Sequence, residues 1–226
     1  MQKEIVIDIE TVPCADPVQV AYLLANVKPD PRLKDPVKVE ADIAEKRAEV
    51  VGKTGLDGSF GRILCAAVCE VASGVVYSVS SAEVDEASVL TELLAHLDRL
   101  VNEDTNTALA PRIIGHNALW DLRFIAQRCA VHGIPFNKRI LPFDAKPWGD
   151  NVADTMTLWA GTKGTITLDR LCVALGVPSP KGEMNGSMVA QYFADGRLAE
   201  IVDYNRADVQ ATRACYLKMK LAGMVA

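Results

Sequence analysis

The chain has 226 residues, of which 50% are hydrophobic and 23% are charged, and its formal net charge is −5. This composition excludes a disordered chain, a collagen-like chain and a small disulfide-stapled domain. No linker, internal repeat or break in composition divides the sequence, so we predict one domain over residues 1–226 with an insertion at about 16–61. The acidic balance argues against indiscriminate electrostatic binding to nucleic acid, but it is compatible with a nucleic-acid enzyme whose local charge is reversed by metal ions.

The N-terminal stretch MQKEIVIDIETV has a short apolar run interrupted by acids, unlike a signal peptide or a membrane span. We therefore predict a cytoplasmic protein. The six cysteines form no C-x-x-C pair and only three histidines are present, which excludes the usual zinc patterns. The thiols are predicted to be reduced and mostly buried.

The first half of the chain begins with strand patterns. Residues Glu4–Ile9 form a nearly continuous apolar run rich in β-branched side chains, which predicts a central strand covered on both faces. After the insertion, Arg62–Val71 and Val75–Val79 predict two more strands joined by a tight turn at Ser73-Gly74.

The insertion differs from its surroundings in composition. It contains four prolines up to Pro36, then a charged segment near Val39–Val50 that predicts a helix. Seven basic and six acidic residues lie between Lys28 and Lys53, as expected of a solvated, salt-bridged helix and loop. The alternative is a lid or flap that contacts a substrate.

The remaining elements alternate between helix and strand, which indicates an α/β fold. Helices are predicted at Glu83–Val101, Ala118–Val131, Leu168–Leu175 and Arg197–Leu221, and strands at Arg112–Gly115 and Asn151–Asp154. Asn117 is expected to cap the second of these helices; Gly176 and Pro178 are expected to end the third, and Gly223 the last.

Two carboxylates lie at the predicted end of the first strand. Asp8 and Glu10 are two residues apart, so the period of a strand places both on the same face of the sheet. They would repel each other unless a positive charge lies between them, and hard divalent cations take carboxylate oxygens. The alternative is a pair of ordinary solvated acids.

Two further acids lie on predicted helices. Asp121 follows a strand-to-helix junction by one turn, where an acid can simply stabilise the helix dipole. Tyr204 and Asp208 are spaced i, i+4 on the last helix, beside a core stripe that includes Ile201 and Ala211. A carboxylate there would be costly or would become neutral, whereas a metal would keep it ionised.

Taken together, D-x-E after the first strand, N-x-x-W-D after the fourth and Y-x-x-x-D on the last helix resemble the DEDD superfamily of 3′-to-5′ exonucleases in its tyrosine subclass. The sequence is most similar to the proofreading domain of family B DNA polymerases, from Val6 to about Leu217. The resemblance implies a ribonuclease H-like fold: a five-stranded mixed sheet flanked by helices, with the second strand antiparallel to the others.

The resemblance also implies roles for individual residues. The metal ligands would be Asp8, Glu10, Asp121 and Asp208, and Tyr204 would orient the attacking water. Thr11, Asn117 and Lys181 would contact the substrate. Trp120 departs from the Phe or Tyr that usually precedes the aspartate, and we expect it to pack in the core.

The resemblance implies a metal-dependent enzyme that acts on nucleic acid. Four carboxylates supply a charge of roughly −4, enough to hold two divalent cations, Mg²⁺ or Mn²⁺. The substrate would be the 3′ end of a single strand, DNA in preference to RNA, from which nucleoside monophosphates would be released by two-metal-ion hydrolysis. No membrane is implied.

Two other readings compete with the exonuclease. The segments VIDIET and GDNVAD resemble motifs of magnesium-dependent phosphatases of the haloacid dehalogenase type, but that family has an aspartate where Glu10 stands. That interpretation also leaves four residues unexplained: Asn117, Asp121, Tyr204 and Asp208. Asp150 and Asp154 are expected to be loop and helix-cap acids. A catalytically silent nucleic-acid-binding module is the second alternative, although every motif acid is present.

Overall fold

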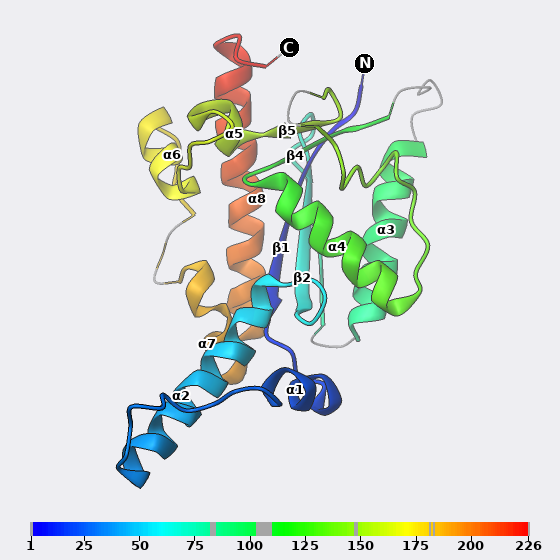
Figure 1. Ribbon diagram of the computed structural model, residues 1–226. Coiled ribbons are helices and arrows are strands. Elements are labelled where there is room, and N and C mark those ends of the chain that lie inside the picture. The colour runs from blue at the N-terminus through cyan, green and yellow to red at the C-terminus, as the bar shows by residue number, and fades with distance from the viewer. Residues whose placement is uncertain are drawn as a thin grey trace.

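The computed structural model describes residues 2–81, 85–102, 110–146, 149–180, 182 and 184–225. Its strands are β1 (Glu4–Val12), β2 (Arg62–Glu70), β3 (Val76–Ser80), β4 (Arg112–Gly115) and β5 (Val152–Asp154). They form one five-stranded sheet in the order β3-β2-β1-β4-β5 (Figure 1). β1 is parallel to β4 and β4 to β5, whereas β2 is antiparallel to both β1 and β3. This confirms the predicted mixed α/β sheet with its reversed second strand, consistent with a ribonuclease H-like fold.

Helices cover both faces of this sheet. The α-helices that the structure describes are α1 (Pro17–Leu24), α2 (Pro36–Lys53), α3 (Glu86–Asn102), α4 (Ala118–His132), α5 (Thr155–Ala160), α6 (Leu168–Leu175), α7 (Val189–Ala194) and α8 (Leu198–Leu221). α3 and α4 lie on one face, and the long α8 lies on the other with α6 and α7 beside it (Figure 1).

The alternation of side chains along β1 divides the core between these two layers. Ile5, Ile7 and Ile9 pack into the cluster that contains the buried residues of α3 and α4. Val6 packs on the opposite face with Val209 of α8. Because side chains in a strand alternate with period 2, the even-numbered residues of β1 face α8.

Most predicted elements are present, with shifted ends. β1 was expected to stop at Ile9 but continues to Val12, because its antiparallel pairing with β2 extends across Glu10 and, after a register shift, to Val12. α3 is observed from Glu86; residues 82–84, which include the predicted start at Glu83, lie outside the described residues. The short helices α5 and α7 were not predicted.

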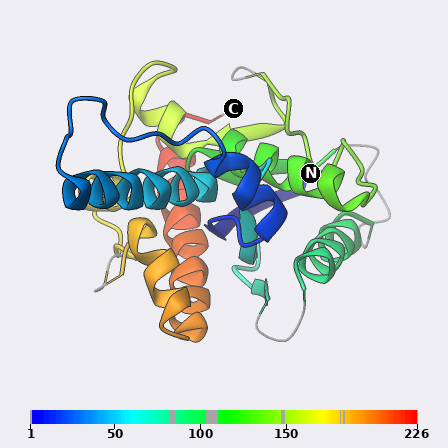
Figure 2. The ribbon, with the colours of Figure 1, turned by 60° about the horizontal axis from the view of Figure 1, so that its bottom comes forward.

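The insertion is more helical than expected. α2 is longer than the predicted Val39–Val50, and α1 was not predicted. Both helices begin with the same signal, an aspartate whose side chain caps the first turn followed by a proline, at Asp16-Pro17 and Asp35-Pro36. Neither helix has a buried residue, and α2 extends away from the sheet (Figure 2).

All six cysteine thiols are free and buried, as predicted from the sequence. Among the helices that the structure describes, none combines the length and apolar character needed to cross a membrane.

Candidate active site

Two of the predicted acids lie on β1, and both face α8. Asp8 and Glu10 follow Val6 at intervals of two, so they continue the face that packs against α8, as the spacing predicted. They lie within the strand rather than at its end, because β1 is longer than expected. Glu10 is only 8% exposed, so its carboxylate is largely removed from water.

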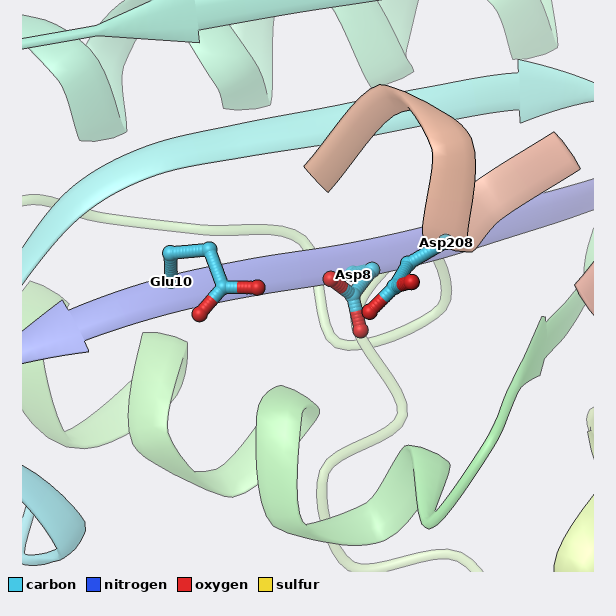
Figure 3. A group of neighbouring side chains, drawn as sticks. All are labelled: Asp8, Glu10 and Asp208. Atoms are coloured by element: carbon cyan, nitrogen blue, oxygen red, sulfur yellow. The ribbon is translucent and has the colours of Figure 1, made fainter. Parts of the chain in front are cut away.

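α8 brings a third acid to the same place. Carboxylate oxygens of Asp8, Glu10 and Asp208 lie within 4.8 Å of one another. Figure 3 shows Asp208 descending from α8 onto Asp8, with Glu10 extending along β1 toward both. The structure therefore joins residues about 200 positions apart in the sequence, and three like charges meet in one small volume.

Asp121 reaches this region from α4, which lies on the opposite face of the sheet from α8. β4 pairs only with Glu4–Val6 of β1, so the following part of β1 has no β4 partner there. The chain turns at Gly115, where an added Cβ would lie 2.8 Å from the Cβ of Ala118, and enters α4. Asp121, 4% exposed in the first turn, then accepts a hydrogen bond from the backbone N–H of Ile9 at 3.3 Å.

Asp121 is not a member of the three-carboxylate group, but its charge acts on that group. Burial raises the pKa of Asp8 well above its ordinary value, and the charges of Asp121, Glu10 and Asp208 raise it further. Burial is also the main reason that the pKa values of Glu10 and Asp121 are raised. Without a counter-charge, these acids therefore tend to take up protons.

The donor set fits a hard divalent cation. Burial raises the pKa of Asp208 to about 7, and its Oδ1 atom is buried without a hydrogen-bond partner among the described residues. A cation would satisfy this oxygen and let the neighbouring carboxylates ionise together. Carboxylate oxygens are ligands that Mg²⁺ and Mn²⁺ accept.

Tyr204 lies one helical turn before Asp208 and is partly buried. Its hydroxyl opposes the effect of burial on the pKa of Asp208. Burial, followed by the charges of Asp208, Glu10 and Asp8, raises the pKa of Tyr204 far above its usual range. The phenol therefore stays protonated at neutral pH and can donate a hydrogen bond in the site.

The predicted substrate contacts have different surroundings. The Thr11 hydroxyl donates to the carbonyl of Gly55 at 2.6 Å, which ties β1 to the end of the insertion. Asn117 precedes α4 as expected, but its side chain makes no capping hydrogen bond because its backbone is left-handed, with φ of 70°. Its N–H instead donates to Asp154 Oδ1 at 3.0 Å. Lys181 lies outside the described residues.

One cavity adjoins Glu10, and a second cavity shares lining residues with it. One of about 370 Å³ is lined by Glu10 and Thr11, and one of about 480 Å³ by Asn117 and Arg123. Leu56 and Trp120 line both cavities. Trp120 was expected in the core; it packs against core residues on one side but is only partly buried, because it also borders these openings.

The acids of the phosphatase-like segment have other surroundings. Asp154 caps α5 by accepting hydrogen bonds from the N–H groups of Met156 and Thr157, as the helix-cap reading expected. Asp150 and Asp154 border a separate cavity of about 460 Å³ that none of the three clustered carboxylates lines.

Sequence reasoning missed one residue at the cluster. Asn205 is 0% exposed, and its Nδ2 donates to Asp8 Oδ2 at 2.6 Å. The signal was an amide in the buried stripe of α8, one residue after Tyr204, where the helical period favours an apolar side chain.

The comparisons with known proteins concern the fold and the family of the chain. A solved family B DNA polymerase from the hyperthermophilic archaeon Pyrobaculum calidifontis has a similar fold, with a TM-score of 0.61 and 16% sequence identity. The match covers 97% of this chain and 25% of the polymerase, so the chain spans about a quarter of that protein's length. No protein in the search of curated sequences matches the chain.

A family model matches residues 53–225, a segment that includes Asp121, Tyr204 and Asp208 and follows Asp8 and Glu10. Its description is a predicted 3′-5′ exonuclease related to the exonuclease domain of PolB. Since the match spans most of the sequence, the chain belongs to this family of PolB-related predicted exonucleases.

Proposed function

We propose that the protein is a metal-dependent 3′-to-5′ exonuclease of the tyrosine subclass of the DEDD superfamily. The observation that carries this proposal is the meeting of Asp8, Glu10 and Asp208 within 4.8 Å, beside Tyr204 and Asp121. Family membership supports the same reaction class. The substrate would be the 3′ end of a single strand of DNA, and RNA is the alternative.

Asp8, Glu10, Asp121 and Asp208 would hold two divalent cations, Mg²⁺ or Mn²⁺. When bound, such cations lower the pKa of water and neutralise charge that develops on a leaving oxygen. The four carboxylates would act as oxygen ligands. Their burial supports this role, because buried carboxylates that stay ionised need paired charges.

Tyr204 would orient the attacking water through its protonated hydroxyl. Attack forms a bond between the water oxygen and the last phosphorus, and the bond from that phosphorus to the preceding 3′ oxygen breaks. The attacking water loses one proton and the departing 3′ oxygen takes one, so the products are a nucleoside 5′-monophosphate and a strand one nucleotide shorter. The main contribution of the protein would be the positioning of these groups.

The strand end would enter through the cavity lined by Glu10 and the second cavity that shares Leu56 and Trp120 with it. We propose that Thr11 and Asn117 border the terminal nucleotides and that Trp120 stacks on a base between the cavities. Arg123 is exposed there and makes no ion pair within the described part of the chain, so it is available for a phosphate. The insertion at 16–61 would act as a flap, since Gly52, Gly55 and Leu56 at its end line the cavity that contains Glu10.

Product analysis tests this function. The protein is incubated with single-stranded DNA and RNA of the same sequence in Mg²⁺, in Mn²⁺ and in chelator. We expect nucleoside 5′-monophosphates as the products, from DNA faster than from RNA, and no reaction in chelator. Nucleoside 3′-monophosphates, or equal rates with and without chelator, would contradict the proposal.

A further inference from the structure

We propose that Asn205 is a positioning residue that holds the Asp8 carboxylate so that its second oxygen faces the acidic cluster. This inference rests on the proposed metal-dependent function, because the group that Asn205 positions is a proposed cation ligand. Asn205 itself would not touch the cation or the substrate.

The contact geometry supports this role. Asn205 Nδ2 donates to Asp8 Oδ2 at 2.6 Å, so the amide holds one of the two carboxylate oxygens in place. Oδ1 of Asp8 receives no hydrogen bond from any described residue, so that oxygen is left for a ligand role. The opposite amide orientation would set Asn205 Oδ1 against a carboxylate oxygen, which is unfavourable.

The contact leaves a buried group of Asn205 unsatisfied. Its Oδ1 is buried without a hydrogen-bond partner among the described residues, and a buried polar atom without a partner destabilises the folded state. The neighbouring stripe positions Ile201 and Val209 are apolar and fully buried, so a leucine would suit the packing of α8. The amide is therefore explained by its contact with Asp8 and not by the core.

The position of Asn205 in α8 couples the two halves of the cluster. Asn205 and Asp208 are three residues apart, so they lie on adjacent parts of one helix face. The same turn of α8 that supplies Asp208 thus fixes the rotamer of Asp8 on β1. Without the amide, repulsion from Asp208 and Glu10 would favour rotation of Asp8 away from them.

The test is Mn²⁺ binding, measured by electron paramagnetic resonance of the free ion with the full chain at fixed pH. Asn205→Leu removes the donor at similar volume, and Asn205→Ala is the second variant in case leucine does not fit. Mutation of a residue that hydrogen-bonds to a metal ligand typically weakens the affinity for the metal by about 10- to 100-fold. We expect the dissociation constant for Mn²⁺ to rise by about that factor, while circular dichroism shows a native fold.

Tyr216→Phe is the matched control. The Tyr216 hydroxyl also joins α8 to a carboxylate of β1, donating to Glu4 Oε1 at 2.6 Å, but Glu4 is not in the acidic cluster. This variant should lose stability without a change in Mn²⁺ affinity. Unchanged affinity in folded Asn205 variants, or an equal shift in Tyr216→Phe, would overturn the positioning role.

Failure of the proposed function would look different. If wild type binds Mn²⁺ but cleaves neither DNA nor RNA, the exonuclease proposal fails, and the role of Asn205 is still decided by the binding data. If wild type binds no Mn²⁺ at millimolar concentration, both proposals are overturned.

Discussion

Tyr204 and Asp208 lie one turn apart on α8, and the tyrosine hydroxyl opposes the rise in the pKa of Asp208 that burial causes. This pair joins a neutral donor to a carboxylate of the cluster. If the hydroxyl orients the attacking water, Tyr204→Phe should keep the ring packing and lower kcat by about 10- to 10³-fold. Single-turnover cleavage of a 5′-labelled strand at saturating metal measures this change.

The matched control for Tyr204 is Tyr192→Phe. Tyr192 is buried on the neighbouring helix α7 and does not belong to the acidic cluster. We expect its rate to stay within about twofold of wild type. An unchanged rate for Tyr204→Phe would remove Tyr204 from the reaction.

The raised pKa values predict how stability depends on pH in chelator. The pKa of Asp208 is raised from 3.8 to about 7, so the folded state binds more protons than the unfolded state between these values. The contribution of Asp208 to the free energy of unfolding is fully present below pH 3.8 and is lost as the pH rises through about 7. Asp208→Asn should therefore gain stability relative to wild type over this range, by on the order of 1–3 kcal/mol.

Chemical unfolding of both proteins across the same pH range in chelator checks this linkage. The difference between wild type and Asp208→Asn cancels the contributions of titrating groups far from the cluster and keeps the effect of the Asp208 charge on the pKa values of Asp8 and Glu10. Excess Mg²⁺ should restore wild-type stability at the upper end of the range, because a bound cation favours the ionised carboxylates. A difference that does not vary with pH would contradict the assignment.

A buried ion pair stabilises the fold away from the acidic cluster. Glu86 at the start of α3 accepts hydrogen bonds from Arg128 of α4 at 2.9 and 2.7 Å, and both side chains are under 10% exposed. Burial acts to raise the pKa of Glu86, but hydrogen bonds from Arg128, Ile63 and His132 leave it lowered. Arg128→Met removes the guanidinium that pairs with the buried Glu86 carboxylate. The free energy of unfolding, measured in urea, should fall by about 3–5 kcal/mol.

An exposed pair provides the comparison for Arg128. Lys53 and Glu49 form an i, i+4 ion pair on α2 with side chains more than half exposed. Lys53→Met should change stability by less than about 1 kcal/mol. Adding Glu86→Gln to Arg128→Met should recover part of the lost free energy of unfolding. No recovery would mean that the loss comes from packing and not from the unpaired charge of Glu86.

Trp120 provides a test of the proposed path of the strand. It lines both cavities, and stacking of an aromatic side chain on a base is typically worth about 1–3 kcal/mol. Trp120→Leu should therefore raise KM for single-stranded DNA by about 5- to 150-fold, with a smaller effect on kcat. Trp159→Leu is the control, because Trp159 of α5 is 40% exposed and lines neither cavity. Equal KM values for the two variants would contradict the stacking role.

The sequence predicts those features of the site that depend on residues close together in the chain. The shared face of Asp8 and Glu10 follows from the period of a strand, and the stacking of Tyr204 and Asp208 follows from the period of a helix. Both relations are local, and both are present in the structure. The five-stranded mixed sheet and its reversed second strand were predicted through the family resemblance and are confirmed.

The features that were missed depend on contacts between distant segments. The bond from Ile9 to Asp121 exists because β4 ends early, and the bond from Asn205 to Asp8 spans 197 positions. The Thr11 hydroxyl is bonded to Gly55 because the insertion returns to β1 there. α1 is the exception among the missed features, because the Asp16-Pro17 pair is a local sequence signal for the start of a helix.

The most direct test of the central claim uses one 5′-labelled DNA strand with a free 3′ end and a matched strand whose 3′ end is blocked. Wild type and Asp208→Asn are compared in Mg²⁺ and in chelator. The account predicts that wild type in Mg²⁺ shortens the free strand stepwise from its 3′ end and leaves the blocked strand intact. Asp208→Asn, and wild type in chelator, should be inactive on both strands. Internal cleavage of the blocked strand, or full activity of Asp208→Asn, would contradict it.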